Sequence, residues 1–200
     1  MIKIEKFYLE EPTLKRKHDV IEYIEEHKKY NSETAGTSGL DDGYKNYENW
    51  MEKNELIKNP ETCPSDKCIG IQYFLIREND NKLVGMINLR WNLNEWMLQY
   101  GGHIGYGVRP TERRKGYNKI NLYLCLLKAK EFGLDKVLLT ADDENLGSVK
   151  TILSFGGELE NKVQTDKEKN GLTCRYWIDV DKALKSTKDI YSPFVAGVHV

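Results

Sequence analysis

The sequence has no long hydrophobic run, no surplus of charge of either sign and few cysteines. No stretch approaches the roughly 18 apolar residues of a membrane-spanning helix, and the opening Met-Ile-Lys-Ile-Glu-Lys does not resemble a signal peptide. Thirty Lys and Arg residues face 31 Asp and Glu residues, which disfavours binding to nucleic acid or anionic membranes through excess positive charge. We therefore expect a cytoplasmic protein with no nucleic-acid and no membrane partner.

Cysteine and histidine are too sparse for a disulfide framework or a metal centre. Cys63 and Cys68 are spaced like half of a zinc site, but no second Cys/His pair follows them. Cys125 and Cys174 are isolated in the sequence, as are all of the histidines. We expect reduced thiols and no metal ion.

The length and composition predict one globular domain. The chain has 200 residues, of which 40% are hydrophobic and 30% charged, enough to bury one core and keep a polar surface. We expect a single domain over residues 1–185. Residues 186–200 show no clear pattern, and we expect them to form a C-terminal tail.

Hydrophobic periodicity and turn residues predict the order of elements. The predicted elements are a strand at about 2–7, a helix over 13–29, a helix from Asp41 or Asp42 through Met51, strands over 70–77, 82–90 and 101–109, a helix over 116–132, a strand over 136–140, a helix over 145–155, and strands over 158–163 and 173–180. The consecutive strands pair antiparallel, whereas the strand-helix-strand unit from 101 to 140 makes a parallel pair. An α/β (α+β) fold with a mixed sheet flanked by helices follows.

The stretch from residue 102 to residue 118 is the most informative. Gly105 and Gly107 lie two apart in a predicted strand, where glycine marks a bulge or a close backbone approach. An Arg-Arg-Lys run at 113–115 then precedes Gly116, which opens a long helix. Free amides at a helix N-terminus beside cations suit a pyrophosphate. The alternative interpretation is a solvated basic turn.

Two familiar phosphate-binding motifs do not fit this stretch. The P-loop requires Gly-Lys-Ser/Thr, but Tyr117 follows Gly116. The dinucleotide fingerprint requires a third glycine where Pro110 stands. A nucleotide-binding protein is therefore the weakest of the hypotheses kept open.

A third motif does fit. The sequence Arg113-Arg-Lys-Gly-Tyr-Asn118 resembles the acyl-CoA loop of the GNAT N-acetyltransferase superfamily, written Gln/Arg-x-x-Gly-x-Gly/Ala. The preceding Ile-Gly-Tyr-Gly-Val-Arg-Pro at 104–110 resembles that family's splayed fourth strand. Asn145-x-x-Ser148, followed by Gly-Gly at 156–157, resembles its Asn-x-x-Ala/Ser segment and helix-ending glycine. The resemblance covers about residues 70–180 and is closest to bacterial predicted acetyltransferases with Gly-Gly-His-Ile-Gly-Tyr before Arg-Pro.

The resemblance implies a GNAT-like fold, a mostly antiparallel central sheet with a splayed parallel strand pair, and acetyl-CoA as cosubstrate without a metal. The residues it places on the cofactor are Val108, Arg113, Arg114, Lys115, Gly116, Tyr117, Asn118, Asn145 and Ser148. Two positions depart from the family pattern. Asn118 replaces a small residue, and Ile152 stands where a tyrosine often protonates the leaving thiolate.

Three residues are candidates for the chemistry. His103 suits a general base because an ordinary histidine pKa lies near neutrality, although a lone histidine is often structural. Tyr106 is the candidate replacement acid, even though strand alternation places it opposite His103. The backbone N–H of Val108 is the candidate donor to an oxyanion.

The sequence thus predicts an enzyme that transfers an acetyl group to a primary amine by direct attack in a ternary complex. The alternative, suggested by Ile152, is a non-catalytic acyl-CoA-binding or regulatory module. The acceptor is a small-molecule or peptide amine, and the resemblance points to 31–43 and 164–172 as its walls. A homodimer is compatible with the sequence.

Overall fold

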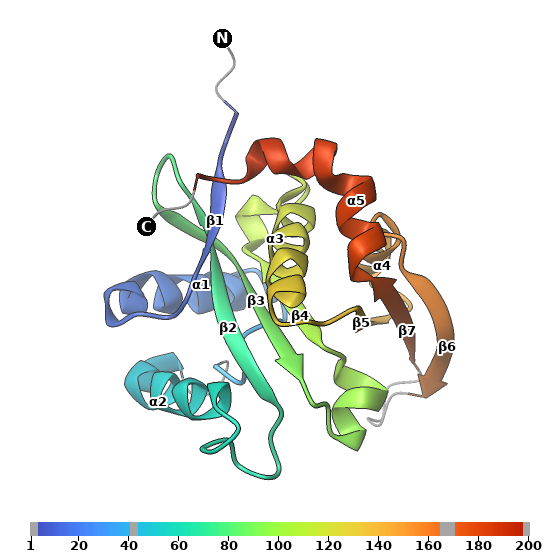
Figure 1. Ribbon diagram of the computed structural model, residues 1–200. Coiled ribbons are helices and arrows are strands. Elements are labelled where there is room, and N and C mark those ends of the chain that lie inside the picture. The colour runs from blue at the N-terminus through green and yellow to red at the C-terminus, as the bar shows by residue number, and fades with distance from the viewer. Residues whose placement is uncertain (1–3, 41–43, 165–170, 198–200) are drawn as a thin grey trace.

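The computed structural model describes residues 4–40, 44–164 and 171–197, which form two antiparallel sheets flanked by helices (Figure 1). The first sheet has the order β1 (Phe7–Glu10), β2 (Ile69–Arg77), β3 (Lys82–Trp91) and β4 (Ile104–Val108). The second has the order β5 (Lys136–Asp142), β7 (Leu172–Asp179) and β6 (Glu158–Gln164). The predicted fold class is confirmed.

Helices cover both faces of the first sheet. Those in contact with it are α1 (Lys17–Lys29), α2 (Tyr47–Lys58) and α3 (Tyr117–Glu131). Of the others, α4 (Leu146–Leu153) contacts β5, and α5 (Val180–Tyr191) contacts α3 and β7. Residues alternate between two cores, as a strand requires. Leu75 and Ile87 pack with α3 and α5, whereas Phe74 and Met86 pack with α1 and α2. The central strands therefore read as continuous apolar runs.

Strands β4 and β5 form the predicted splayed pair, connected through α3. The N–H of His103 donates to the carbonyl of Leu138 at 2.7 Å, just before β4 begins. Beyond that point no backbone hydrogen bond joins the two strands in the described structure. The backbones of Tyr106 and Val108 therefore have no strand partner on the side away from β3, and this unpaired region between β4 and β5 is called the gap below.

Some predicted boundaries are wrong. The first strand runs over 7–10 rather than 2–7, and Ile4 is exposed. The strand predicted over 101–109 is only 104–108, because a π-helical turn over Met97–Gly101 precedes it. The second helix is capped by Asn46, whose side chain accepts from the N–H of Asn49; the predicted caps at 41 and 42 lie outside the described residues.

The largest difference between the prediction and the structure lies in the C-terminal segment, which was predicted to be a tail. The segment from residue 186 continues α5 to Tyr191, and Thr187 and Tyr191 are buried. Val195 then bridges to Phe7 in parallel, and the N–H of Ala196 donates to the carbonyl of Phe7 at 2.8 Å. Figure 1 shows α5 beside α3. The chain through residue 197 is thus part of the packed structure.

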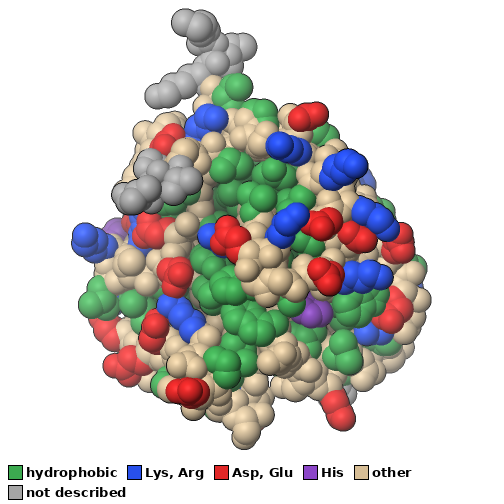
Figure 2. Space-filling model, in the orientation of Figure 1, with side chains coloured by type: hydrophobic (Ala, Val, Ile, Leu, Met, Phe, Trp, Pro, Cys, Tyr) green, Lys and Arg blue, Asp and Glu red, His purple; other side chains and the backbone are tan. Residues whose placement is uncertain are grey.

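The surface matches the balanced composition. On the face shown in Figure 2, positive and negative side chains are interspersed, and neither sign forms a continuous patch. Among the described residues, no helix combines the length and apolar character needed to cross a membrane.

Candidate active site

The start of α3 offers a set of free backbone donors. Gly116 caps the helix with φ +83°, a conformation that favours glycine. Within the described part of the chain, the N–H groups of residues 114–118 make no hydrogen bond. A Cβ built on Gly116 would meet nothing within 4 Å, so the space above these amides is open. Such a helix terminus attracts anions.

The cations beside this loop are held by the protein itself. Arg113 donates to the carbonyl of Val108 at 3.1 Å and to Oγ of Ser32 at 2.7 Å. The ammonium of Lys115 bonds to Glu112 at 2.7 Å, while Arg114 is exposed with φ +61°. Arg113 and Lys115 are thus engaged within the protein, so the free amides and Arg114 are the groups at this loop that a ligand could reach.

Glu112 anchors the loop and was not singled out from the sequence. It is buried and accepts from Arg77 at 3.0 Å, Lys82 at 2.8 Å and Lys115 at 2.7 Å. Burial alone would raise the pKa of Glu112, but the bonds from Lys115, Lys82 and Arg77 lower it to about 2. The loop is thereby tied to β2 and β3.

The side chain of Tyr117 is engaged in hydrogen bonds within the protein, whereas that of Asn118 has an acceptor atom without a partner among the described residues. The hydroxyl of Tyr117 donates to Glu5 at 2.6 Å and accepts from Arg77 at 3.2 Å. Its ring packs on Phe7 with centroids 4.7 Å apart, so only its backbone remains for a ligand. Oδ1 of Asn118 is buried and has no partner among the described residues, which leaves an acceptor at the helix start.

Backbone groups of β4 face the gap. The N–H of Arg109 donates to Val84 of β3 at 2.9 Å, and the carbonyl of His103 accepts from Arg90 at 2.8 Å. Because bonding direction alternates along a strand, the N–H and carbonyl groups of Tyr106 and Val108 point away from β3. The carbonyl of Val108 accepts from Arg113, which leaves both groups of Tyr106 and the N–H of Val108 without a backbone partner in the described structure.

A cavity of about 1050 Å³ opens on the α1 and α2 side of the sheet. Its walls come from the 33–39 loop, α2, the 96–101 turn and the ends of β2 to β5. Of the predicted site residues, it brings together Tyr106, Asn145 and Ser148. Residues 33–39, part of the first predicted acceptor wall, line this cavity, whereas most of the second predicted wall lies outside the described residues.

Tyr106 reaches from β4 to the start of α4. Its hydroxyl lies 2.8 Å from Oγ of Ser148, and Asn145 caps α4 by accepting from the N–H of Ser148 at 3.1 Å. Burial raises the pKa of Tyr106 to about 12, against the lowering effect of the Ser148 bond. The phenol is therefore protonated at neutral pH and can donate a proton.

His103 lies elsewhere and is not among the residues that line the cavity. Its Nδ1 accepts from the N–H of Leu138 at 2.9 Å, and its ring lies 5.9 Å from that of Trp177. Burial, and then the charge of Arg90, lower the pKa of His103 to about 4. The lone pair that a base would use is thus occupied, and the geometry supports a structural role.

Ile152 stands where the family often has a tyrosine, and it is fully buried in the core with Phe155. Its hydrocarbon side chain cannot donate a proton to a leaving thiolate. Tyr106 is then the one proton donor among the predicted catalytic residues that borders the cavity.

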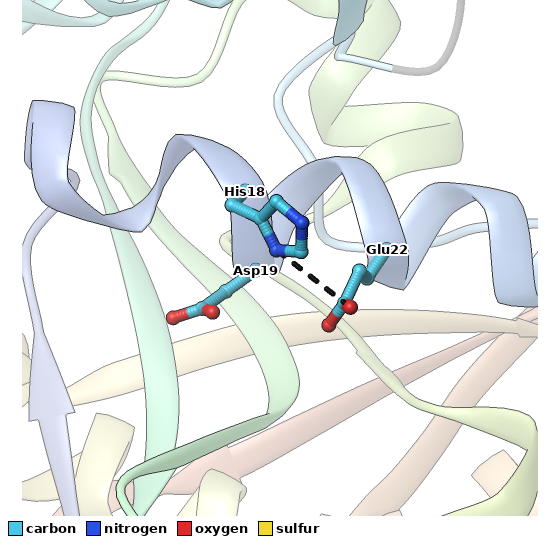
Figure 3. A group of neighbouring side chains, drawn as sticks. All are labelled: His18, Asp19 and Glu22. Carbon is cyan, nitrogen blue, oxygen red and sulfur yellow. Dashed lines mark ion pairs between the residues drawn. The ribbon is translucent and has the colours of Figure 1, made fainter.

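Figure 3 shows a group of potential metal ligands on α1, made of His18, Asp19 and Glu22. Nδ1 of His18 lies 3.6 Å from Glu22, and both side chains are exposed. Asp19 already pairs with Arg16 at 2.9 Å. None of the three lines the cavity, and we assign the group no role in the site.

Comparison with known proteins places this geometry in a family. Residues 24–156, more than half of the chain, match the model of the acetyltransferase (GNAT) family. No curated protein gives a significant match to the sequence.

Solved structures share the fold at low sequence identity. The ribosomal-protein-S5-alanine acetyltransferase from Vibrio fischeri has a TM-score of 0.67 at 13% identity, covering 89% of this chain and 96% of that one. The spermidine/spermine N-acetyltransferase SpeG from Vibrio cholerae has a TM-score of 0.64 at 14% identity, covering 91% and 98%.

The microcin C7 self-immunity acetyltransferase MccE, solved with acetyl-CoA and AMP, has a TM-score of 0.63 at 17% identity, covering 86% of this chain and 91% of that one. The resemblance drawn from the loop, the strand before it and the Asn-x-x-Ser segment is therefore confirmed. The chain belongs to the GNAT family of acetyltransferases.

Proposed function

We propose that this protein transfers the acetyl group of acetyl-CoA to a primary amine held in the cavity. One observation carries the proposal: the unpaired side of β4 runs from the free amides at the start of α3 to the cavity. Free amides lie at the start of α3, the unpaired edge of β4 runs past Tyr106 and Val108, and the cavity meets Tyr106 from the other face.

The residues present fit acetyl-CoA. The pyrophosphate suits the N–H groups of residues 114–118, because amides at a helix start bind anions without needing free cations. The amides of the pantetheine arm suit the outward N–H and carbonyl groups of Tyr106, as an added strand does. The N–H of Val108 then remains for the acetyl group, while the carbonyl of Val108 accepts from Arg113. The carboxamide of Asn145 borders the same cavity.

In the proposed reaction the neutral amine nitrogen attacks the thioester carbonyl carbon, a C–N bond forms, and the C–S bond breaks. The N–H of Val108 donates to the oxyanion, and Tyr106 gives its proton to the departing thiolate. Water in the cavity takes the proton that the ammonium loses, since Nδ1 of His103 is occupied. The nitrogen is positively charged once the C–N bond has formed, and it loses its second proton to water as the amide product forms. The phenolate of Tyr106 recovers a proton from solvent.

The test has two steps. Calorimetry measures acetyl-CoA binding, with ATP as the comparison ligand, and thiol release is then followed over a panel of primary amines. We expect acetyl-CoA to bind much more tightly than ATP, and thiol release to depend on the amine. Binding without amine-dependent release favours the non-catalytic acyl-CoA module, and equal binding of ATP favours a nucleotide-binding protein.

A further inference from the structure

We propose that Arg90 binds a carboxylate of the acceptor, so that the acceptor is a zwitterion whose carboxylate lies several bonds from the reacting nitrogen. The inference rests on the proposed function and names the substrate class for the same cavity. It starts from the charges on the cavity wall.

Arg90 differs from every other charged residue that lines the cavity. The others are exposed to solvent: Glu33, Lys53, Asp66, Lys67 and Asp142. Asp66 and Lys67 also pair with each other at 3.2 Å. Arg90 is partly buried at the end of β3, under the 97–101 turn. Its charge therefore acts inside the cavity rather than in bulk water.

No carboxylate in the described structure neutralises this guanidinium. Its Nη2 donates to the carbonyl of Gly101 at 3.1 Å, and its Nε is buried without a partner. Burial lowers the pKa of Arg90, and its positive charge contributes to lowering the pKa of His103. A buried arginine is normally paired, so its missing partner is a feature that a ligand can supply.

The sheet leaves room for this side chain on the acceptor face. Gly70 is the register partner of Arg90 on β2, and a Cβ there would lie 3.0 Å from Cγ of Arg90. A Cβ on Gly105 of β4 would lie 3.5 Å from Nη2. Gly70 therefore makes room for the arginine stem, and the contact near Gly105 places the guanidinium beside β4.

The position of Arg90 sets the length of the acceptor. Gly105 precedes Val108 by three residues, which is about 10 Å along a strand. The attacking nitrogen must lie about 3 Å from the acetyl carbon near Val108. The bond between the guanidinium and the carboxylate takes up about 3 Å more, so the amine nitrogen and the carboxylate are at least about 4 Å apart. An α-amino acid is too short for this span, whereas a longer ω-amino acid such as 6-aminohexanoate reaches both ends. One guanidinium matches one carboxylate in charge and in its two-point geometry.

The experiment compares 6-aminohexanoate with 6-aminohexanamide, which has nearly the same shape but no charge at the far end. In the wild-type protein we expect kcat/KM to be about 10- to 100-fold higher for the acid, the range for a charge-assisted bond. Arg90→Met should remove this preference mainly through KM, with the KM for acetyl-CoA unchanged. Arg90→Lys should restore part of it, and Lys188→Met, an exposed cation on α5, should leave it intact.

Binding of the product 6-acetamidohexanoate, measured by calorimetry with CoA present, tests Arg90 without turnover. Wild-type protein should bind it at least 10-fold more tightly than Arg90→Met does. Equal activity of the wild type on acid and amide, equal losses for both in Arg90→Met, or equal product binding by the two proteins would overturn the inference and leave acetyl transfer standing. Failure to bind acetyl-CoA would instead count against the proposed function.

Discussion

At the residue scale, His103 and Tyr106 show what a sequence pattern can and cannot assign. Alternation placed them on opposite faces of one strand, and the structure agrees that only Tyr106 borders the cavity. The partner of His103 is the backbone of Leu138, far along the chain. No local pattern encodes that bond, because it exists only once β5 returns beside β4.

The pKa of His103 gives a testable pH dependence. Its pKa falls from 6.5 to about 4 in the folded protein, so the unfolded chain binds more protons between these values. Stability from His103 is thus complete above about pH 6.5 and is lost as the pH falls toward 4. His103→Gln keeps an acceptor for Leu138 but does not titrate.

Urea denaturation at pH 7, 5.5 and 4.5 measures this difference. We expect the wild type to lose about 1–2 kcal/mol more than His103→Gln across that range, less than the full pKa displacement implies because the ring is partly exposed. Turnover should change by less than about 3-fold. A 100-fold loss of turnover would restore His103 as the general base.

Tyr106 is predicted to act as the acid. Tyr106→Phe removes the proton donor but keeps the ring, so kcat should fall by about 10- to 100-fold while the Kd for acetyl-CoA changes little. Because burial raises the pKa of Tyr106 to about 12, wild-type kcat should not decline between pH 8 and 10 from loss of this proton. Tyr123→Phe, which removes a hydroxyl outside the cavity, is the control; equal rates in both variants would exclude Tyr106.

At the element scale, periodicity located the interiors of most helices and strands but not their ends. The helix predicted over 116–132 is observed over 117–131, with Gly116 as its cap. The strand predicted over 101–109 loses its first residues to the 97–101 turn. That turn depends on tertiary contacts, such as the bond from Arg175 of β7 to the carbonyl of Leu98 at 3.0 Å.

The role of the free amides at the start of α3 can be tested by comparing the glycines at the two ends of the helix. Gly116 and Gly133 have φ of +83° and +73°, and neither would place a Cβ within 4 Å of another atom. Valine at either position carries similar backbone strain, of about 1–2 kcal/mol or more. Only Gly116→Val places a side chain over the free amides, so it should weaken acetyl-CoA binding by at least 10-fold. Gly133→Val should not.

Lys115→Ala should weaken acetyl-CoA binding by less than about 3-fold in the same calorimetric series, since its ammonium is already bonded to Glu112. Equal losses in Gly116→Val and Lys115→Ala would show that cations, and not amides, hold the anion.

At the scale of the whole molecule, sequence motifs indicated the fold and a candidate cofactor loop but not the interior of the cavity. Arg90 ends an apolar run, which predicts the solvated end of a strand. Its burial follows from its bond to Gly101 in the 97–101 turn and from the glycine opposite it on β2. Glu112 is similar, because its partners come from β2, β3 and the loop itself. Most of the residues that surround Arg90 and Glu112 are distant in the sequence and come together only in the folded chain.

The C-terminal segment offers the last test, because the sequence predicted a tail and the structure shows a packed helix. Tyr191 stacks on Phe155 with ring centroids 5.2 Å apart and lies 5.8 Å from Tyr123, so it joins α5 to α4 and α3. Deleting so large a buried ring leaves a cavity, and Tyr191→Ala should lower the free energy of unfolding by about 3–5 kcal/mol. Ile190→Ala is the matched control, since Ile190 is 57% exposed and should cost less than about 1 kcal/mol. Denaturant unfolding of the two variants decides the matter: a tail would give two small and equal losses, whereas a packed helix gives a large loss at Tyr191 alone.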